Sequence, residues 1–173
     1  MEPIEIFERY LNQLITILEK AQGFCAEQTI KETELLEERL APDMFPLKQQ
    51  ISTAINFTIR ICAPLANNPH LNVPINTKSF ADCIASCEQM IQRLYELEID
   101  QHFADNLPMI QSTSGFQENE FHAMEYIYAY GLPNFIFHLS MVYSILRKNG
   151  VPLSKGDFDG YHAYPEGFYF DAD

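Results

Sequence analysis

The sequence predicts an all-α protein, an up-down-up-down four-helix bundle. Four long stretches carry apolar side chains at steps of three and four residues, which is the spacing of one face of an α-helix. Segments rich in proline, glycine or asparagine separate these stretches. The 173 residues are 47% hydrophobic, so the chain can bury a core without a metal or disulfide. We expect residues 1–173 to form one domain.

The first helix is predicted over residues 4–21. Its apolar side chains form one stripe, made of Ile4, Phe7, Leu11, Leu14 and Leu18. Gly23 is a suitable stop signal for this helix. A short, Glu-rich helix from Glu27 to Arg39 is predicted next, and its composition is typical of a solvent-exposed face.

The second helix is predicted to begin after a break that contains Pro42 and Pro46. Proline excludes helical angles from the residue before it, whereas Pro46 itself is well placed in a first helical turn. This helix should end near Pro64, and residues 66–76 read as a loop. Asp43 lies at the mouth of the helix, where it is either an N-terminal cap or a carboxylate of a functional site.

The third helix is predicted to begin at Thr77, a good N-cap residue. Its stripe consists of Phe80, Cys83, Ile84, Cys87, Met90, Ile91, Leu94 and Leu97. The following stretch, 101–118, has a weaker pattern. We interpret residues 112–115 as the turn of a small hairpin that precedes the last helix.

The last helix shows the clearest end signals in the chain. Residues 119–130 look helical and aromatic, Gly131 interrupts them, and Pro133 then opens a long helix. Gly150 supplies a left-handed cap, and Pro152 prevents the helix from continuing.

The C-terminal extension, residues 151–173, is acidic and aromatic. Its rings are Phe158, Tyr161, Tyr164, Phe168, Tyr169 and Phe170. Because disordered tails are poor in aromatic residues, we expect this extension to be ordered. It should pack along its own bundle, or otherwise across a subunit partner.

Charge and cysteine content exclude several classes of function. The chain has 11 Lys and Arg against 24 Asp and Glu, a net charge of −13, which disfavours binding to nucleic acid or to anionic membrane surfaces. No apolar run is long enough to span a membrane. The acidic N-terminus is not a signal peptide, so we expect a cytoplasmic protein whose cysteines are buried thiols.

His138 is the strongest candidate for a functional residue, because it lies on a helix that is apolar nearly all round. It is either a core histidine with a hydrogen-bond partner or a ligand. A metal site in a bundle needs several ligands that project inward, often one turn apart. One turn away from His138 the chain carries Asn134 and Val142. His122 lies beyond the break at Gly131, so its facing relative to His138 cannot be predicted.

Three segments resemble a known family. They are residues 40–47 (LAPDMFPL), 132–138 (LPNFxFH) and 143–158 (YxILRxNGVPLxKxDF). Together they resemble an uncharacterised bacterial and fungal family, known only as a domain of unknown function, within the DinB/YfiT-like superfamily. The resemblance covers roughly residues 4–160.

The resemblance implies a DinB-like four-helix bundle that is often homodimeric. Better-known members of the superfamily bind a divalent metal through three histidines, and several are thiol-dependent transferases or isomerases; for this chain the metal would be zinc or nickel. Only His138 carries over from that pattern. The histidine of the second helix is missing, and so is a second histidine at position 134 or 142.

Two functions remain open, and whether the protein is an enzyme stays undecided. The first is a bundle that binds a small molecule or a partner, in which Asp43, Asn134, His138 and Arg147 form a buried polar network. The second is a divergent enzyme in which Asp43, His138 and His122 hold a zinc or nickel ion. The second requires these ligands to converge within about 5 Å.

Overall fold

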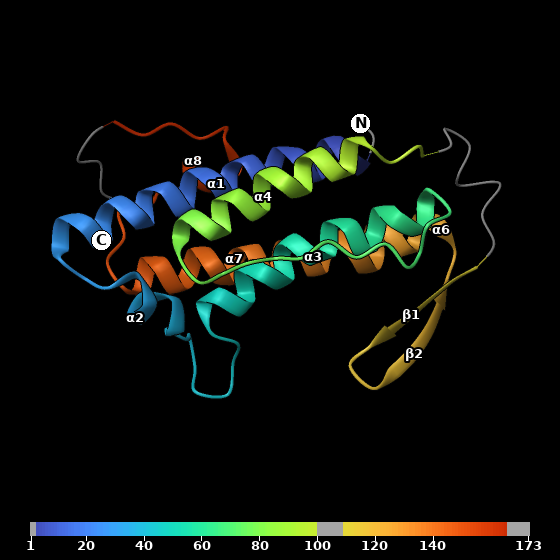
Figure 1. Ribbon diagram of the computed structural model, residues 1–173, viewed down its shortest axis with the longest axis horizontal. Helices are drawn as coiled ribbons and strands as arrows, with labels where there is room; N and C mark the ends of the chain where they lie inside the picture. Colours follow the sequence, from blue (N-terminus) through green and yellow to red (C-terminus); the bar gives the residue numbers. More distant parts are fainter. Residues whose placement is uncertain (1–2, 100–108, 166–173) are drawn as a thin grey trace, which may run out of the picture.

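The computed structural model describes residues 3–99 and 109–165, and its four long helices form a bundle (Figure 1). They are α1 (Pro3–Gln28), α3 (Leu47–Leu65), α4 (Phe80–Tyr95) and α7 (Leu132–Lys148). Their apolar faces meet in one buried core. The all-α bundle predicted from the sequence is therefore confirmed. None of the described helices is long and apolar enough to cross a membrane.

The helix directions are up, down, down and up. At one end of the bundle, the ring of Phe7 near the start of α1 lies 5.2 Å from that of Phe135 near the start of α7. At the same end, the hydroxyl of Tyr95 at the end of α4 donates to the carboxylate of Glu8. Helix α1 therefore runs parallel to α7 and antiparallel to α4.

The predicted alternation of directions is wrong for the middle pair, because α3 and α4 run the same way (Figure 1). The cause is the connection over residues 66–79, which returns along the bundle before α4 begins. Extended, it can reach roughly 45 Å, whereas α3 is roughly 28 Å long. The sequence indicates a loop here, but it does not indicate that the loop is a crossover.

The first helix runs through Gly23 and is longer than predicted, ending at Gln28. A turn with a positive φ of 57° at Thr29 then leads into the short helix α2 (Glu32–Glu37). The carboxylate of Glu32 accepts a hydrogen bond of 2.8 Å from the backbone N–H of Phe80. Helix α2 thus fastens the end of α1 to the start of α4.

Helix α4 is capped by Ser79 rather than by the predicted Thr77. The Ser79 hydroxyl accepts a hydrogen bond of 3.1 Å from the backbone N–H of Asp82. Both residues are good caps, and the chain uses the one next to Phe80, the first buried position of the helix.

The predicted hairpin is present as strands β1 (Ile110–Ser114) and β2 (Gln117–Phe121), which pair antiparallel. Its predicted turn at 112–115 is placed too early, because residues 112–114 pair with β2 and the turn is at 115–116. Gly115 occupies the turn with a φ of 60°, a left-handed conformation that glycine adopts without strain. The hairpin stands beside the end of α3, outside the bundle (Figure 1).

The interruption predicted at Gly131 is wrong, because the chain stays helical there. The helix predicted over 119–130 begins later than expected, because residues 119–121 belong to strand β2. Helix α6 (Ala123–Glu125) continues through a π-helical turn over Tyr126–Gly131 directly into α7. A Cβ atom at Gly131 would lie 2.4 Å from Cδ1 of Ile61. The glycine therefore serves close packing of this turn against α3, not helix termination.

The end of α7 is as predicted. Gly150, with a φ of 93°, donates its N–H to the carbonyl of Arg147, and Val151 donates to that of Leu146. This pair of bonds is the Schellman motif, which satisfies the last carbonyls of a helix.

The C-terminal extension begins with helix α8 (Lys155–Asp159), which packs on α1. The amine of Lys20 lies 2.6 Å from the carboxylate of Asp157, and the ring of Tyr10 lies 6.1 Å from that of Phe158. The predicted order of residues 166–173 lies outside the described part of the chain.

Candidate functional site

His138 is buried between α3 and α7, with 9% of its surface exposed. Its Nδ1 donates a hydrogen bond of 2.7 Å to Oε1 of Gln50, and Gln50 donates in turn to the carbonyl of Phe45. The imidazole lies between the rings of Phe45 and Phe57, at centroid distances of 6.3 and 5.6 Å. Burial lowers the pKa of His138 below its usual value. The residue has the environment of a neutral core histidine.

The other predicted site residues do not join His138. Asp43 is exposed in the turn before α3, whose N-cap residue is Pro46, so Asp43 is not the predicted cap. Arg147 is exposed and donates to the carbonyl of Val151 at the end of α7.

His122 and Asn134 flank the π-helical turn instead of approaching His138. His122 is exposed at the start of α6, where its side chain makes no cap hydrogen bond. Nδ2 of Asn134 donates a hydrogen bond of 2.6 Å to the carbonyl of Tyr130. The partner of His138 is therefore Gln50, and the predicted polar network of four residues is not formed.

Metal ligands do not gather in the part of the chain that the structure describes. Over residues 3–99 and 109–165, no group of three or more His, Cys, Asp or Glu side chains is arranged to hold an ion. Asp43, His122 and His138 thus do not form the predicted set of converging ligands.

The four cysteines are buried, free thiols: Cys25, Cys62, Cys83 and Cys87. Burial raises the pKa of Cys62 and of Cys83 to about 12, and it also raises that of Cys87. Since the thiolate is the reactive form, burial and a raised pKa disfavour reaction at these three thiols. This agrees with the expectation of buried thiols.

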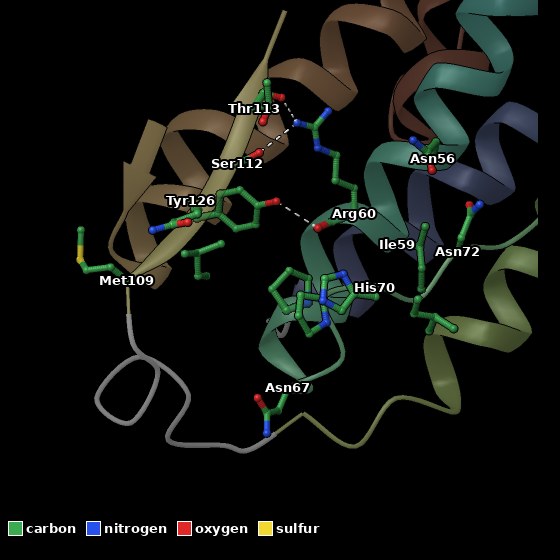
Figure 2. A pocket seen from close by; sticks show the side chains of 15 residues that line it. Asn56, Ile59, Arg60, Asn67, His70, Asn72, Met109, Ser112, Thr113 and Tyr126 are labelled. Carbon is green, nitrogen blue, oxygen red and sulfur yellow. Dashed lines mark hydrogen bonds between the residues drawn. The ribbon is translucent and has the colours of Figure 1, made fainter. Parts of the chain in front are cut away.

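An open cavity lies at the end of α3 that faces the hairpin. It has a volume of about 820 Å³ and is lined by α3, the loop over residues 67–72, and strand β1 (Figure 2). Ligand sites in proteins usually have volumes of roughly 300–1,000 Å³. The cavity therefore has the size of a small-molecule site.

Arg60 is the central charged residue of this cavity. It projects from α3 toward the hairpin, where its Nη2 donates a hydrogen bond of 2.9 Å to the hydroxyl of Ser112 and another to the carbonyl of Thr113 (Figure 2). Its guanidinium group lies 5.3 Å from the ring centroid of Phe57 and 5.6 Å from that of Tyr130. These contacts hold the cation in place at the cavity wall.

Tyr126 also lines the cavity, close to Arg60 (Figure 2). Its hydroxyl donates a hydrogen bond of 3.1 Å to the carbonyl of Arg60, which joins the π-helical turn to α3. Burial raises the pKa of Tyr126 above its usual value, so this hydroxyl keeps its proton at neutral pH. It can act as a hydrogen-bond donor but not as a base.

Sequence reasoning does not find this cavity. Arg60 lies between Ile59 and Ile61 in a strongly apolar stretch. From sequence alone it looks like an ordinary solvent-exposed residue of an amphipathic helix. The one sequence feature that could have indicated the cavity is a single arginine in an otherwise apolar stretch. Its partners Ser112 and Thr113 come from a distant hairpin, and no spacing in the sequence indicates that contact.

Comparison with known proteins places the chain in a family. A family model described as a domain of unknown function, DUF1993, matches residues 2–159. The chain belongs to the DUF1993 family. No curated protein matches it significantly.

A solved structure has the same architecture. The crystal structure of a DinB family member protein from Shewanella denitrificans is 25% identical in sequence, with a TM-score of 0.78. The match covers 93% of this chain and 91% of that one. The DUF1993 chain is therefore DinB-like in fold, as the three sequence segments indicated.

Proposed function

We propose that this DUF1993 protein binds a small molecule in the cavity between α3, the 67–72 loop and β1. The observation that carries the proposal is the cavity itself, about 820 Å³ in volume, with both apolar and polar walls. A few fixed polar groups in a concave, partly apolar site are typical of ligand pockets. Arg60 and Tyr126 are such groups, because hydrogen bonds hold both of them in position.

A ligand screen by thermal shift, with binding confirmed by calorimetry, tests this proposal. Asn56 lines the cavity, so Asn56→Trp should fill part of it and abolish binding of any compound found. Asn12 is exposed on α1, and Asn12→Trp is the matched control that should bind normally. Compounds that bind both variants equally well would place the ligand elsewhere and contradict the proposal.

Homodimer formation, which the resemblance implies, is a further proposal. The helix formed by α6, the π-helical turn and α7 exposes three large apolar side chains, Met124, Tyr128 and Phe137. Exposed apolar side chains on one helix support a contact with a second copy. Sedimentation equilibrium should show a dimer, and Phe137→Glu should shift it toward monomer. A wild-type protein that sediments as a monomer would contradict the proposal.

The alternative, a divergent metal-dependent enzyme, requires a ligand set that includes His138. The hydrogen bond from Nδ1 to Gln50 leaves Nε2 as the ring nitrogen for a metal. Metal analysis of untagged protein purified without chelator tests this alternative. Stoichiometric zinc or nickel that is lost in His138→Ala would support it, whereas a metal content unchanged by that substitution would contradict a role for His138.

A further inference from the structure

We infer that the ligand of this cavity is a small organic monocarboxylate with an apolar body, bound through its carboxylate to Arg60. The inference rests on the proposed function, because it names the class of molecule that the cavity takes. Three observations carry it: the charge of the cavity walls, the geometry of Arg60, and the apolar surface beside it.

The described walls of the cavity carry a single permanent charge, and it is positive. Arg60 supplies it, and none of the other described residues that line the cavity is an aspartate, glutamate or lysine. This is unusual in a chain with 24 acidic and 11 basic side chains. A cavity that contains the cation and excludes the abundant carboxylates attracts an anion.

Arg60 has no carboxylate partner among the described residues, although it is firmly positioned. Within residues 3–99 and 109–165, its side-chain hydrogen bonds both come from Nη2, one to Ser112 and one to Thr113. A guanidinium group has five N–H donors, so Nη1 and Nε have capacity for a ligand. Their planar, forked arrangement matches the two oxygens of a carboxylate.

The apolar part of the lining suits an apolar body that carries only one negative charge. Ile59, Leu71, Met109 and Ile110 provide apolar surface in the cavity, and the uncharged polar part is contributed by residues such as Asn56 and Asn72. One cation balances one anionic group, whereas a di- or triphosphate would bring several charges into the same space. A monocarboxylate with an aromatic or aliphatic body satisfies both the charge and the walls.

A pair of compounds that differ only in charge tests the inference. 2-Naphthoate carries a carboxylate, and 2-naphthamide has nearly the same shape without the charge. Calorimetry with the wild-type protein should show that naphthoate binds at least ~10-fold more tightly, the gain expected of a charge-assisted hydrogen bond. Equal binding of the two compounds overturns the inference but leaves the cavity as a ligand site. Failure of both to bind also overturns the inference, and the ligand screen with Asn56→Trp decides separately whether the cavity is a ligand site at all.

Substitution of Arg60 tests whether this residue causes the preference for naphthoate over naphthamide. Arg60→Gln should weaken naphthoate binding ~10-fold or more and leave naphthamide binding unchanged. Arg93→Gln removes an equal charge from the exposed face of α4, and this matched control should bind both compounds normally. Naphthoate binding that survives Arg60→Gln overturns the inference.

A measurement on the wild-type protein avoids any effect of Arg60→Gln on the hairpin. Added sodium chloride should weaken naphthoate binding and leave naphthamide binding unchanged, since salt screens an attraction between charges. Affinities of both compounds that respond equally to salt would contradict a role for the arginine.

Discussion

The hydrogen bond between His138 and Gln50 makes the stability of the protein depend on a buried pair. The ring of His138 fills space between two phenylalanines, and Gln50 is buried beside it. His138→Ala should lower the free energy of unfolding by about 1–3 kcal/mol, because it leaves a void and an unpaired amide. Urea unfolding measures this. Unchanged stability would show that the pair contributes nothing.

His138 should also make stability depend on pH. Burial lowers the pKa of His138 in the folded protein below the ordinary 6.5, so the unfolded chain takes up a proton first as pH falls. The free energy of unfolding should therefore decrease as pH drops through about 6.5 and level off below the folded-state pKa. His138→Gln should remove this step, and a wild-type profile without it would contradict the assignment.

The packing of Gly131 against Ile61 gives a prediction with its own control. A Cβ at residue 131 would lie 2.4 Å from Cδ1 of Ile61, so Gly131→Ala should destabilise the protein by about 1–3 kcal/mol through overpacking. In an Ile61→Ala background the same change should cost much less. Gly23 is the control, because a Cβ added there would meet no neighbour within 4 Å, and Gly23→Ala should stabilise α1 by about 0.5–1 kcal/mol. Equal effects at the two glycines would contradict this account.

At the scale of elements, local signals predict most of the fold, and the errors have physical causes. The helical stripes, the hairpin turn at Gly115 and the cap at Gly150 depend on residues close together in the sequence, so they can be read directly. The breaks predicted at Gly23 and Gly131 are wrong because a glycine inside a helix looks the same in sequence as one that ends a helix. The direction of α4 depends on where the 66–79 connection leads, which local patterns do not show.

The contact between α8 and α1 should open in acid. Burial alone would raise the pKa of Asp157, but hydrogen bonds from Lys20 and from Ser154 outweigh it and hold that pKa below its usual value. The contact therefore stabilises the fold above the ordinary pKa of about 4, and its contribution is lost as pH falls through the folded-state value. The protection of the α8 amides against hydrogen exchange, taken relative to the intrinsic exchange rate at each pH, should fall there.

Asp157→Asn should reproduce this opening at neutral pH, with a loss of about 1 kcal/mol from the capping box at Ser154. Glu19→Gln, which neutralises an exposed carboxylate next to Lys20 on α1, is the matched control. Protection of the α8 amides that stays high at every pH, relative to the intrinsic exchange rate, would contradict the role of Asp157.

At the scale of the whole molecule, the fold and the site differ in how much of each is readable from sequence. The bundle follows from periodicity, and the match to a DinB family structure over 93% of the chain agrees with it. The cavity instead depends on Arg60, Ser112 and Tyr126, which belong to three elements that only the tertiary fold brings together. A residue's role in such a site is set by neighbours that lie far away in sequence.

Net charge and cavity charge have opposite signs, so salt should act on the fold and on the site in opposite directions. The net charge of −13 makes the folded chain repel itself, and raising ionic strength from about 0.01 M to about 0.15 M shortens the Debye length from roughly 30 to 8 Å. The melting temperature of the free protein should therefore rise by a few degrees. Over the same range, naphthoate binding at Arg60 should weaken. A melting temperature that falls with salt would mean that favourable ion pairs, such as Lys20 with Asp157, outweigh the general repulsion.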